Sequence, residues 1–365
     1  MKDGIEVDFL PVGENKRSGD AIVIRWREND EYKVMVYDGG TKDYGKEIVA
    51  HIQKYYGVDY IDYVVNSHPD NDHAGGLAYV LENMSVGELW MHRPWAHSAE
   101  IRDFFHDGRI TDNSLAERLK DKMSAAYALE KIAEERDIPI IEPFADCQIG
   151  IFKVLSPLRA RYTSELIPEF EKSPEQKKSN VIVEGMESFN DKIKSLAASF
   201  VDKWNFEYLP ETVKTSAENE SSAILFAKVN KKGFLLTGDA GIKSLREAAV
   251  FAQGSGIDLP QEVFFVQIPH HGGRHNVSTE TLDLIIGKPL SSRGQNPTRK
   301  AYVSVGKEAP THPKKVVTNA FVRRGFEVAK TKGQSIRYHY NMEARDGWVP
   351  LEYVPFYDDP TEAEE

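Results

Sequence analysis

The chain has a single cysteine, Cys147, among its 365 residues. One cysteine excludes an internal disulfide and fits a reducing compartment. No stretch approaches the roughly 18 consecutive apolar residues of a membrane-spanning helix, so the sequence predicts no membrane partner. Residues 1–5 include an acid where a signal peptide carries basic and then apolar residues. Together these absences lead us to expect a cytoplasmic protein.

An overall excess of positive charge is also missing, because the formal net charge is −11. On average such a chain disfavours nucleic acid as a partner. The average hides a basic segment, residues 288–337, which holds twelve Lys or Arg and two acids for a net charge of +10 and leaves −21 for the remainder. This segment could steer a phosphate-bearing substrate, or it could be a solvated face of a few surface elements. The sequence leaves both interpretations open.

The most informative stretch that is present runs from Ser67 to Gly76 and follows a strand-like run, residues 61–66. Four potential metal ligands stand within six residues, namely His68, Asp70, Asp72 and His73. Imidazole and carboxylate groups bind zinc, manganese or iron at neutral pH. In an extended loop the alternate positions 68, 70 and 72 point to one side, and His73 turns in from the following element. The pattern therefore predicts a metal site and not a polar surface loop.

Polar clusters follow three further strand-like runs. Asp239 comes after an apolar run and Gly238, the pair His270-His271 follows the run 262–268, and His312 follows the run 301–306 less directly. Asp38, before two glycines at the end of the run 32–37, often marks a site but also fits a plain turn. Functional residues collect at such strand ends, so we expect these side chains to share one edge of a sheet.

The remaining pattern predicts an α/β domain with strands at 5–10, 21–26, 88–91, 149–155, 222–229, 234–237, 326–329 and 335–340, and helices at 45–56, from 77, 243–252 and 316–323. Between about 92 and 218 the pattern favours helices, at 114–136, 159–172 and 187–204, with a polar loop at 173–180. We interpret this region as a mostly helical insertion in a single domain, 1–357, before an acidic tail, 358–365. Its histidines, His92, His97 and His106, fit structural roles better than ligand roles.

As a set, these motifs resemble the metallo-β-lactamase superfamily: His-x-[His/Asp]-x-Asp-His, then Gly-Asp, then His-Gly. Within it, the chain is most similar to the soluble hydrolase domain of the ComEC competence proteins. The shared features are Ser-His-Pro-Asp-x-Asp-His-x-Gly-Gly, Asn219-x-x-Ser222, Leu-Leu-Thr-Gly-Asp, Pro-His-His-Gly, Ser304-Val305-Gly306 and His312-Pro313. The resemblance covers residues 5–340 except the insertion. It implies an αββα sandwich with a two-metal site along one edge.

The resemblance also implies roles for single residues. One ion would be held by Asp72, His73, Asp239 and His271, and the other by His68, Asp70 and the shared Asp239. His270 would be free to bind substrate or donate a proton, so we count Asp72, His270 and His312 as candidate catalytic residues and Lys314 and Lys315 as candidate substrate contacts.

Two departures from the family pattern concern the metal. Asp70 stands where most of the superfamily has a histidine, and this harder oxygen ligand favours manganese over zinc. No histidine stands before Asp239 at the position where the family has a metal ligand, and Asn219 is the nearest residue to it. We therefore expect the coordination of the first ion to be open. The turn from Val12 to Asp20 is also longer than the usual one.

Two divalent ions roughly 3.5–4 Å apart would activate a water for in-line displacement, which suits phosphoester hydrolysis best. The leading expectation is a phosphodiesterase or nuclease acting on nucleic acid or nucleotides. The alternatives are a small-molecule phosphoester hydrolase similar to phosphorylcholine esterases, or a non-catalytic metal-binding module that binds a protein partner through the insertion. A lactam or thioester substrate fits less well, because those relatives keep the histidine that Asp70 replaces.

Overall fold

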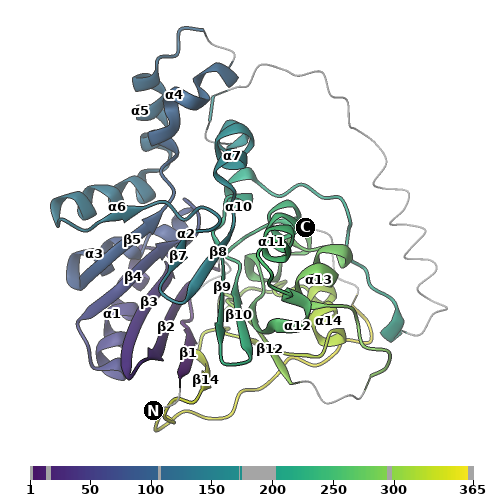
Figure 1. Ribbon diagram of the computed structural model, residues 1–365. Helices are drawn as coiled ribbons and strands as arrows, with labels where there is room; N and C mark the ends of the chain where they lie inside the picture. Colours follow the sequence, from purple (N-terminus) through teal and green to yellow (C-terminus); the bar gives the residue numbers. More distant parts are fainter. Residues whose placement is uncertain are drawn as a thin grey trace.

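The computed structural model describes residues 3–13, 18–105, 108–171, 173–174, 203–293 and 298–360. Two seven-stranded sheets lie face to face with helices on both outer sides (Figure 1). The expected α/β class and αββα sandwich are thereby confirmed.

The first sheet has the order β14-β1-β2-β3-β4-β5-β6. Its strands alternate or run apolar, as strands buried on one or both faces do. They are β1 (Gly4–Phe9), β2 (Ala21–Glu28), β3 (Glu31–Gly39), β4 (Tyr60–Asn66), β5 (Ser85–Met91), β6 (Ile140–Ile141) and β14 (Ile336–Tyr340).

The second sheet has the order β13-β12-β11-β10-β9-β8-β7. Its strands are β7 (Gln148–Ile149), β8 (Phe152–Ser156), β9 (Ile224–Val229), β10 (Lys232–Leu236), β11 (Val263–Gln267), β12 (Arg299–Val303) and β13 (Phe326–Lys330). The short strands β6, β7 and β8 fall within the stretch expected as an insertion. Residues 140–156 are therefore part of the sandwich, and the helical additions lie on either side of them.

The helices cover the outer faces and form the additions. Among the described residues they are α1 (Gly45–His51), α2 (Asn71–Ala74), α3 (Leu77–Asn83), α4 (Ser98–Ile101), α5 (Asp112–Lys122), α6 (Ser124–Glu135), α7 (Arg159–Arg161), α8 (Ile167–Glu169), α10 (Ala217–Glu220), α11 (Ile242–Gly254), α12 (Leu259–Glu262), α13 (Thr279–Ile286) and α14 (Lys315–Arg323). Two π-helical turns, Ile52–Tyr56 and Tyr162–Leu166, extend α1 and α7.

Three apolar layers hold this architecture together. One lies between the first sheet and α1, α3 and α6, one lies between the second sheet and α11, α13 and α14, and one fills the space between the sheets. The middle layer is rich in aromatic rings, such as Phe9 against Tyr302 and Trp26 against Phe152. Burial of this apolar surface provides most of the folding free energy.

The strand directions place the site. β3, β4 and β5 run parallel to one another, and so do β10, β11 and β12. Their carboxyl ends therefore meet at one edge of each sheet. Figure 1 shows α2, which follows β4, beside α10 at this edge.

Some local expectations need correction. The helix expected at 114–136 is two helices, because Met123 leaves helical geometry (φ −113°, ψ 45°), and its N-cap is Thr111, with Ser114 completing the capping box. The helix α13 was not expected. His106, most of the loop 173–180, most of the helix 187–204 and residues 361–365 of the tail lie outside the described residues. Within the described part, no helix combines the length and apolar character needed to cross a bilayer.

Candidate metal centre

The loop after β4 packs tightly against the end of β3. A Cβ added to Gly76 would lie 2.0 Å from the Gly39 carbonyl oxygen, and the Gly76 N–H donates to the Gly40 carbonyl at 3.0 Å. Gly75 and Gly76 therefore let α2 pack on the turn Gly39-Gly40, which holds His68 and His73 at the sheet edge.

Three histidines of the centre are held by their Nδ1 atoms. His271 Nδ1 lies 3.1 Å from the carbonyl oxygen of Ser304, His73 Nδ1 lies 2.9 Å from Asp38 Oδ2, and His68 Nδ1 lies 2.9 Å from Ser67 Oγ. Ser67 Oγ donates to Asp38 at 2.6 Å, so it accepts from His68. These contacts assign the ring proton to Nδ1 and leave each Nε2 with a lone pair.

Those Nε2 atoms are buried and have no hydrogen-bond partner. The same holds for Oδ1 of Asp239. Buried polar atoms without partners are costly, and four at one place call for a missing ligand. Neutral imidazole nitrogens and a carboxylate oxygen are donors that bind divalent ions. The residues present therefore fit a metal centre.

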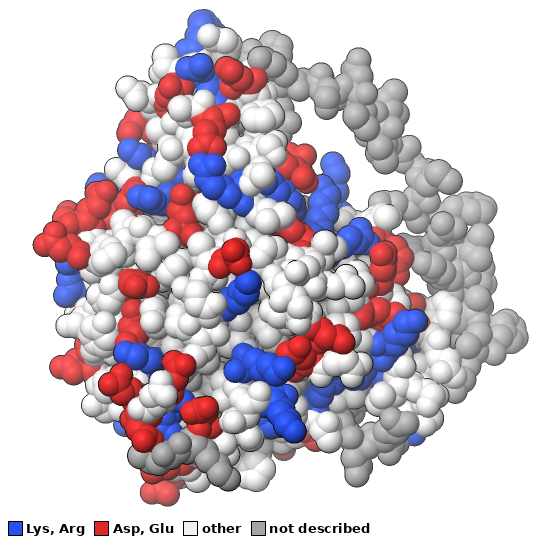
Figure 2. All heavy atoms as spheres, viewed as in Figure 1, with Lys and Arg blue, Asp and Glu red and all other residues white. Residues whose placement is uncertain are grey.

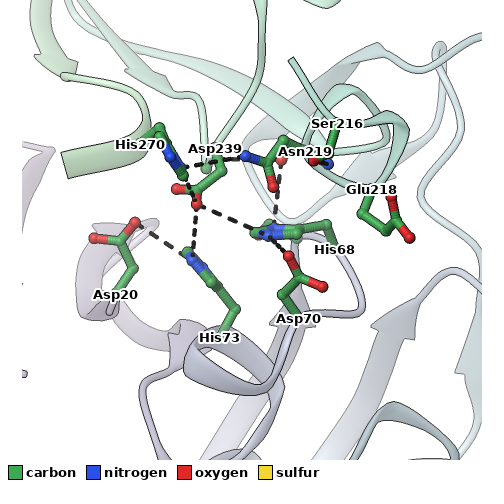
Figure 3. Close-up of polar contacts among 12 residues, drawn as sticks. Asp20, His68, Asp70, His73, Ser216, Glu218, Asn219, Asp239 and His270 are labelled. Carbon is green, nitrogen blue, oxygen red and sulfur yellow. Dashed lines mark hydrogen bonds and ion pairs between the residues drawn. The ribbon is translucent and has the colours of Figure 1, made fainter. Parts of the chain in front are cut away.

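The expected ligands form two overlapping groups, and a third group joins His73 to Asp20 and Asp38. Ligand atoms of His68, His73 and Asp239 lie within 4.8 Å of one another, and so do those of Asp72, His73 and His271. Asp239 Oδ2 lies 3.2 Å from His73 Nε2 and 3.9 Å from His68 Nε2 (Figure 3). His73 thus belongs to both groups, whereas the resemblance gave the shared position to Asp239 alone.

Asp70 lies at the rim of the centre. Its carboxylate is 3.7 Å from His68 Nε2, and its side chain is 31% exposed. Figure 3 shows Asp70 below His68 and Asp239 between His68, His73 and His270. The six residues expected as ligands therefore meet at one edge of the sandwich.

The electrostatics of the centre favour a cation. Burial alone would raise the pKa of Asp239, but the nearby His73, His270 and His271 hold it well below its usual range. Burial would lower the pKa of His73, but Asp239 and Asp38 raise it well above its usual value. Without a metal the carboxylates thus favour a second proton on His73, at Nε2. A bound ion would take the place of that proton.

His270 differs from the other histidines. Its Nδ1 lies 2.6 Å from Asp239 Oδ2 and 3.3 Å from the side-chain nitrogen of Asn219, and its side chain is 38% exposed. Both His270 and His271 have positive φ values, 48° and 55°. Such backbone strain is kept at sites where orientation matters. His270 is therefore the histidine of this cluster that solvent reaches.

Two buried carboxylates support the centre from behind. Asp38 binds His73 and, through Ser67, orients His68. Asp20 lies 4.0 Å from His73 Nδ1, and burial raises its pKa against the opposing effect of His271 and His73. The sequence singled out Asp38 but not Asp20; its position directly before β2 was the available signal.

The loop after β12 reaches the centre through His271's neighbour. A Cβ on Gly272 would lie 2.4 Å from Pro313 Cβ, and the Lys314 N–H donates to the Gly272 carbonyl at 3.1 Å. His312 follows Thr311 in this loop, where the two side chains lie 3.3 Å apart. Lys314 is only 4% exposed, and Lys315 lies over the Tyr357 ring at 5.6 Å. Neither lysine belongs to an open basic surface.

The basic segment is largely engaged inside the fold. Arg324 is fully buried and contacts Glu207 and Asp283, each at 2.7 Å. Arg337 pairs with Glu6, and Lys300 pairs with Glu327. Figure 2 shows Lys and Arg mixed with Asp and Glu on the face it presents. Neither interpretation from the sequence describes Arg324 and Arg337, which are buried against acidic partners. Both interpretations stay predictions for the exposed cations of the segment, Lys288, Lys307 and Lys332.

A second polar cluster includes the loop after β5 and consists of His92, His97, Glu142 and Tyr162. His92 stacks on Tyr162 with ring centroids 4.5 Å apart, and burial lowers its pKa to about 4. His97 Nε2 lies 3.1 Å from the Glu142 carboxylate. As expected, neither histidine belongs to the groups that could hold a metal among the described residues.

Comparison with known proteins agrees with this picture. The family model of the metallo-beta-lactamase superfamily matches residues 15–142, which include the first sheet's metal loop. The match and the two-sheet sandwich both indicate a resemblance to that superfamily. No match was found among curated proteins.

Solved structures resemble the chain only distantly. The metallo-beta-lactamase fold protein YhfI from Bacillus subtilis is 9% identical, over 92% of this chain and 100% of that one, with a TM-score of 0.40. A diphosphatase of the PhnP family is 10% identical, over 92% and 98%, with a TM-score of 0.39. The hydrolase AbOPH is 9% identical, over 97% and 94%, with a TM-score of 0.34. Similarity at this level says nothing of substrate.

Proposed function

We propose that the protein is a metal-dependent hydrolase that cleaves a phosphodiester. The observation that carries the proposal is the set of buried, partnerless atoms on His68, His73, His271 and Asp239. When bound there, one or two divalent ions would supply an activated water and stabilise charge on the phosphoryl oxygens. The carboxylates of Asp70 and Asp72 favour manganese over zinc, as the sequence predicts.

The chain's own residues would orient the substrate and handle a proton. Among the buried cluster, His270 has an exposed ring edge and a short contact to Asp239. Burial lowers the pKa of His270, but Asp239 raises it above its usual value. In this position His270 would contact the phosphoryl group or donate a proton to the leaving oxygen. His312 would approach from the neighbouring loop.

The substrate we favour is a small phosphodiester of nucleotide size and not a polymer. A long polyanion needs a track of available cations. Four cations of residues 288–337 are instead paired with Glu207, Asp283, Glu6 and Glu327, namely Lys300, Arg323, Arg324 and Arg337. Nucleic acid, which similarity to ComEC proteins would favour, is the second candidate, because Lys288, Lys307 and Lys332 of the same segment are exposed.

A substrate panel tests the proposal. Metal-free protein is supplied with manganese or zinc and offered a chromogenic phosphodiester, a phosphomonoester, cyclic dinucleotides, single-stranded and duplex DNA, RNA and a lactam. We expect hydrolysis of the small diesters, faster with manganese, and none by Asp239→Asn. Stoichiometric metal without turnover of any substrate would favour the non-catalytic binding module, and faster cleavage of polymers than of small diesters would favour the nuclease.

A further inference from the structure

Gln267 is the last residue of β11, and its side chain joins the two sheets at the metal edge. It is fully buried. Its Oε1 accepts from the backbone N–H groups of Thr237 and Gly238, at 2.9 and 3.0 Å, and its Nε2 donates to Asp20 Oδ2 at 2.9 Å. The two backbone donors fix which end of the amide is oxygen.

The turn that Gln267 holds carries Asp239. The next N–H, that of Asp239 itself, donates to Ser222 Oγ at 3.1 Å. Three successive backbone N–H groups are thus bound by side chains. Gly238 has φ 52°, and a Cβ there would lie 3.0 Å from Ser67. The position of Asp239 therefore depends on side-chain contacts that the turn does not provide for itself.

The other end of the Gln267 amide reaches the support of the first sheet's ligands. Asp20 stands directly before β2 and lies 4.0 Å from His73 Nδ1. Across the centre, His73 Nε2 lies 3.2 Å from Asp239 Oδ2. One buried amide thus connects the carboxylate behind His73 with the turn that presents Asp239.

We propose that Gln267 is a positioning residue that sets the separation between the two halves of the metal centre. The inference rests on the proposed metal binding. Partners that orient ligands typically contribute about 10–100-fold to metal affinity. The competing interpretation is a buried amide that stabilises the sandwich alone, for which stability would fall equally with and without metal.

Gln267→Met tests the proposal, because methionine has similar length but cannot replace the three hydrogen bonds. Tyr302→Phe is the matched control: the Tyr302 hydroxyl also donates between the sheets, to the Arg337 carbonyl at 3.3 Å, without touching the Asp239 turn. The measurements are equilibrium dialysis with manganese and with zinc, and amide hydrogen exchange of the metal-free proteins.

In Gln267→Met we expect metal affinity to fall about 10-fold or more. The amides of Thr237 and Gly238 should exchange faster than in the wild type. In Tyr302→Phe both should stay close to wild type. Unchanged metal affinity in a folded Gln267→Met protein would overturn the proposal, as would equal losses in the two variants.

Gln267→Glu is a second variant in case the methionine is not tolerated. Glutamate keeps the acceptor for Thr237 and Gly238, so their protection should persist, but an ionised carboxylate cannot donate to Asp20 and metal affinity should still fall. Affinity equal to wild type would refute a role for the Asp20 link. If the wild type itself binds no metal, the proposed function fails, whereas unchanged exchange at Thr237 and Gly238 in Gln267→Met would separately overturn the positioning role.

Discussion

The metal edge and the basic segment are both dense in ionisable side chains, yet they end in opposite states. At the metal edge, Nε2 atoms of His68, His73 and His271 are buried without partners. In the basic segment, Arg324 is equally buried but has Glu207 and Asp283 against it. A charge count cannot separate these cases. A cluster of buried polar atoms without partners indicates a bound ligand, whereas buried charges with partners indicate a structural role.

The largest effect should come from Asp239→Asn, because this buried carboxylate lies 3.2 Å from His73, which belongs to both ligand groups. A metal lowers the pKa of its bound water by roughly eight units, so loss of the ions should reduce turnover more than about 10⁴-fold. Metal content and hydrolysis of a chromogenic phosphodiester are measured together. Asp103→Asn, at an exposed side chain, is the control. Near-normal metal content in Asp239→Asn would contradict the role of Asp239 as a metal ligand.

Arg324→Met tests whether the buried ion pairs of the basic segment stabilise the fold. Removing one member of a buried ion pair leaves its partners uncompensated and should cost about 3–5 kcal/mol of unfolding free energy. Denaturant unfolding measures it. In contrast, Arg293→Met breaks an exposed pair with Asp358 and should change stability by less than about 1 kcal/mol. A small change in the unfolding free energy of Arg324→Met, accompanied by weaker binding of DNA, would indicate that the basic segment contacts substrate.

His92 sharpens the comparison, since its two ring nitrogens also lack partners but no ligand group includes it. Burial lowers its pKa to about 4 in the folded protein. Between pH 6.5 and 4 the unfolded chain binds this proton more readily, so stability should be complete above pH 6.5 and fall by up to roughly 3 kcal/mol toward pH 4.

The test is the unfolding free energy of wild type and His92→Phe across pH 4–7.5. The phenylalanine variant should show a flatter curve and unchanged metal content, whereas His339→Phe, at an exposed position, should track the wild type. Loss of metal from His92→Phe would mean that the second cluster belongs to the centre after all.

The smallest effect is expected from Lys315→Glu. Its ammonium lies over the Tyr357 ring, a contact worth about 0.5–1 kcal/mol. Turnover of a small phosphodiester and affinity for single-stranded DNA should each change less than about threefold, because one phosphate contact at most is involved. Fluorescence anisotropy at two salt concentrations measures the affinity. A steep loss with a shallower salt dependence would favour the nuclease.

Local patterns predicted much of this structure because local chemistry determines it. Apolar runs located β1 to β5, and the spacing from His68 to His73 located four of the six candidate ligands. The helix break at Met123 and the pairing of β6 with β5 depend on packing that no local run encodes.

Partners distant in sequence explain what was missed. Arg324 meets Glu207, and Gln267 meets Asp20, across more than a hundred residues. Single positions such as these give no local signal of a contact. The basic segment therefore looked available in the sequence, and the role of Asp20 was not visible.

The division of the centre between two sheets has a consequence for folding. His68 and Asp239 are 171 positions apart in the chain, so the ligands assemble only after the long-range pairing of both sheets is complete. An ion can then bind the native state but not the unfolded chain, and at a hundred times its dissociation constant it would add about 2.7 kcal/mol of stability. The metal would stabilise a fold that is already complete, so a chelator should lower the melting temperature of the protein without changing its structure.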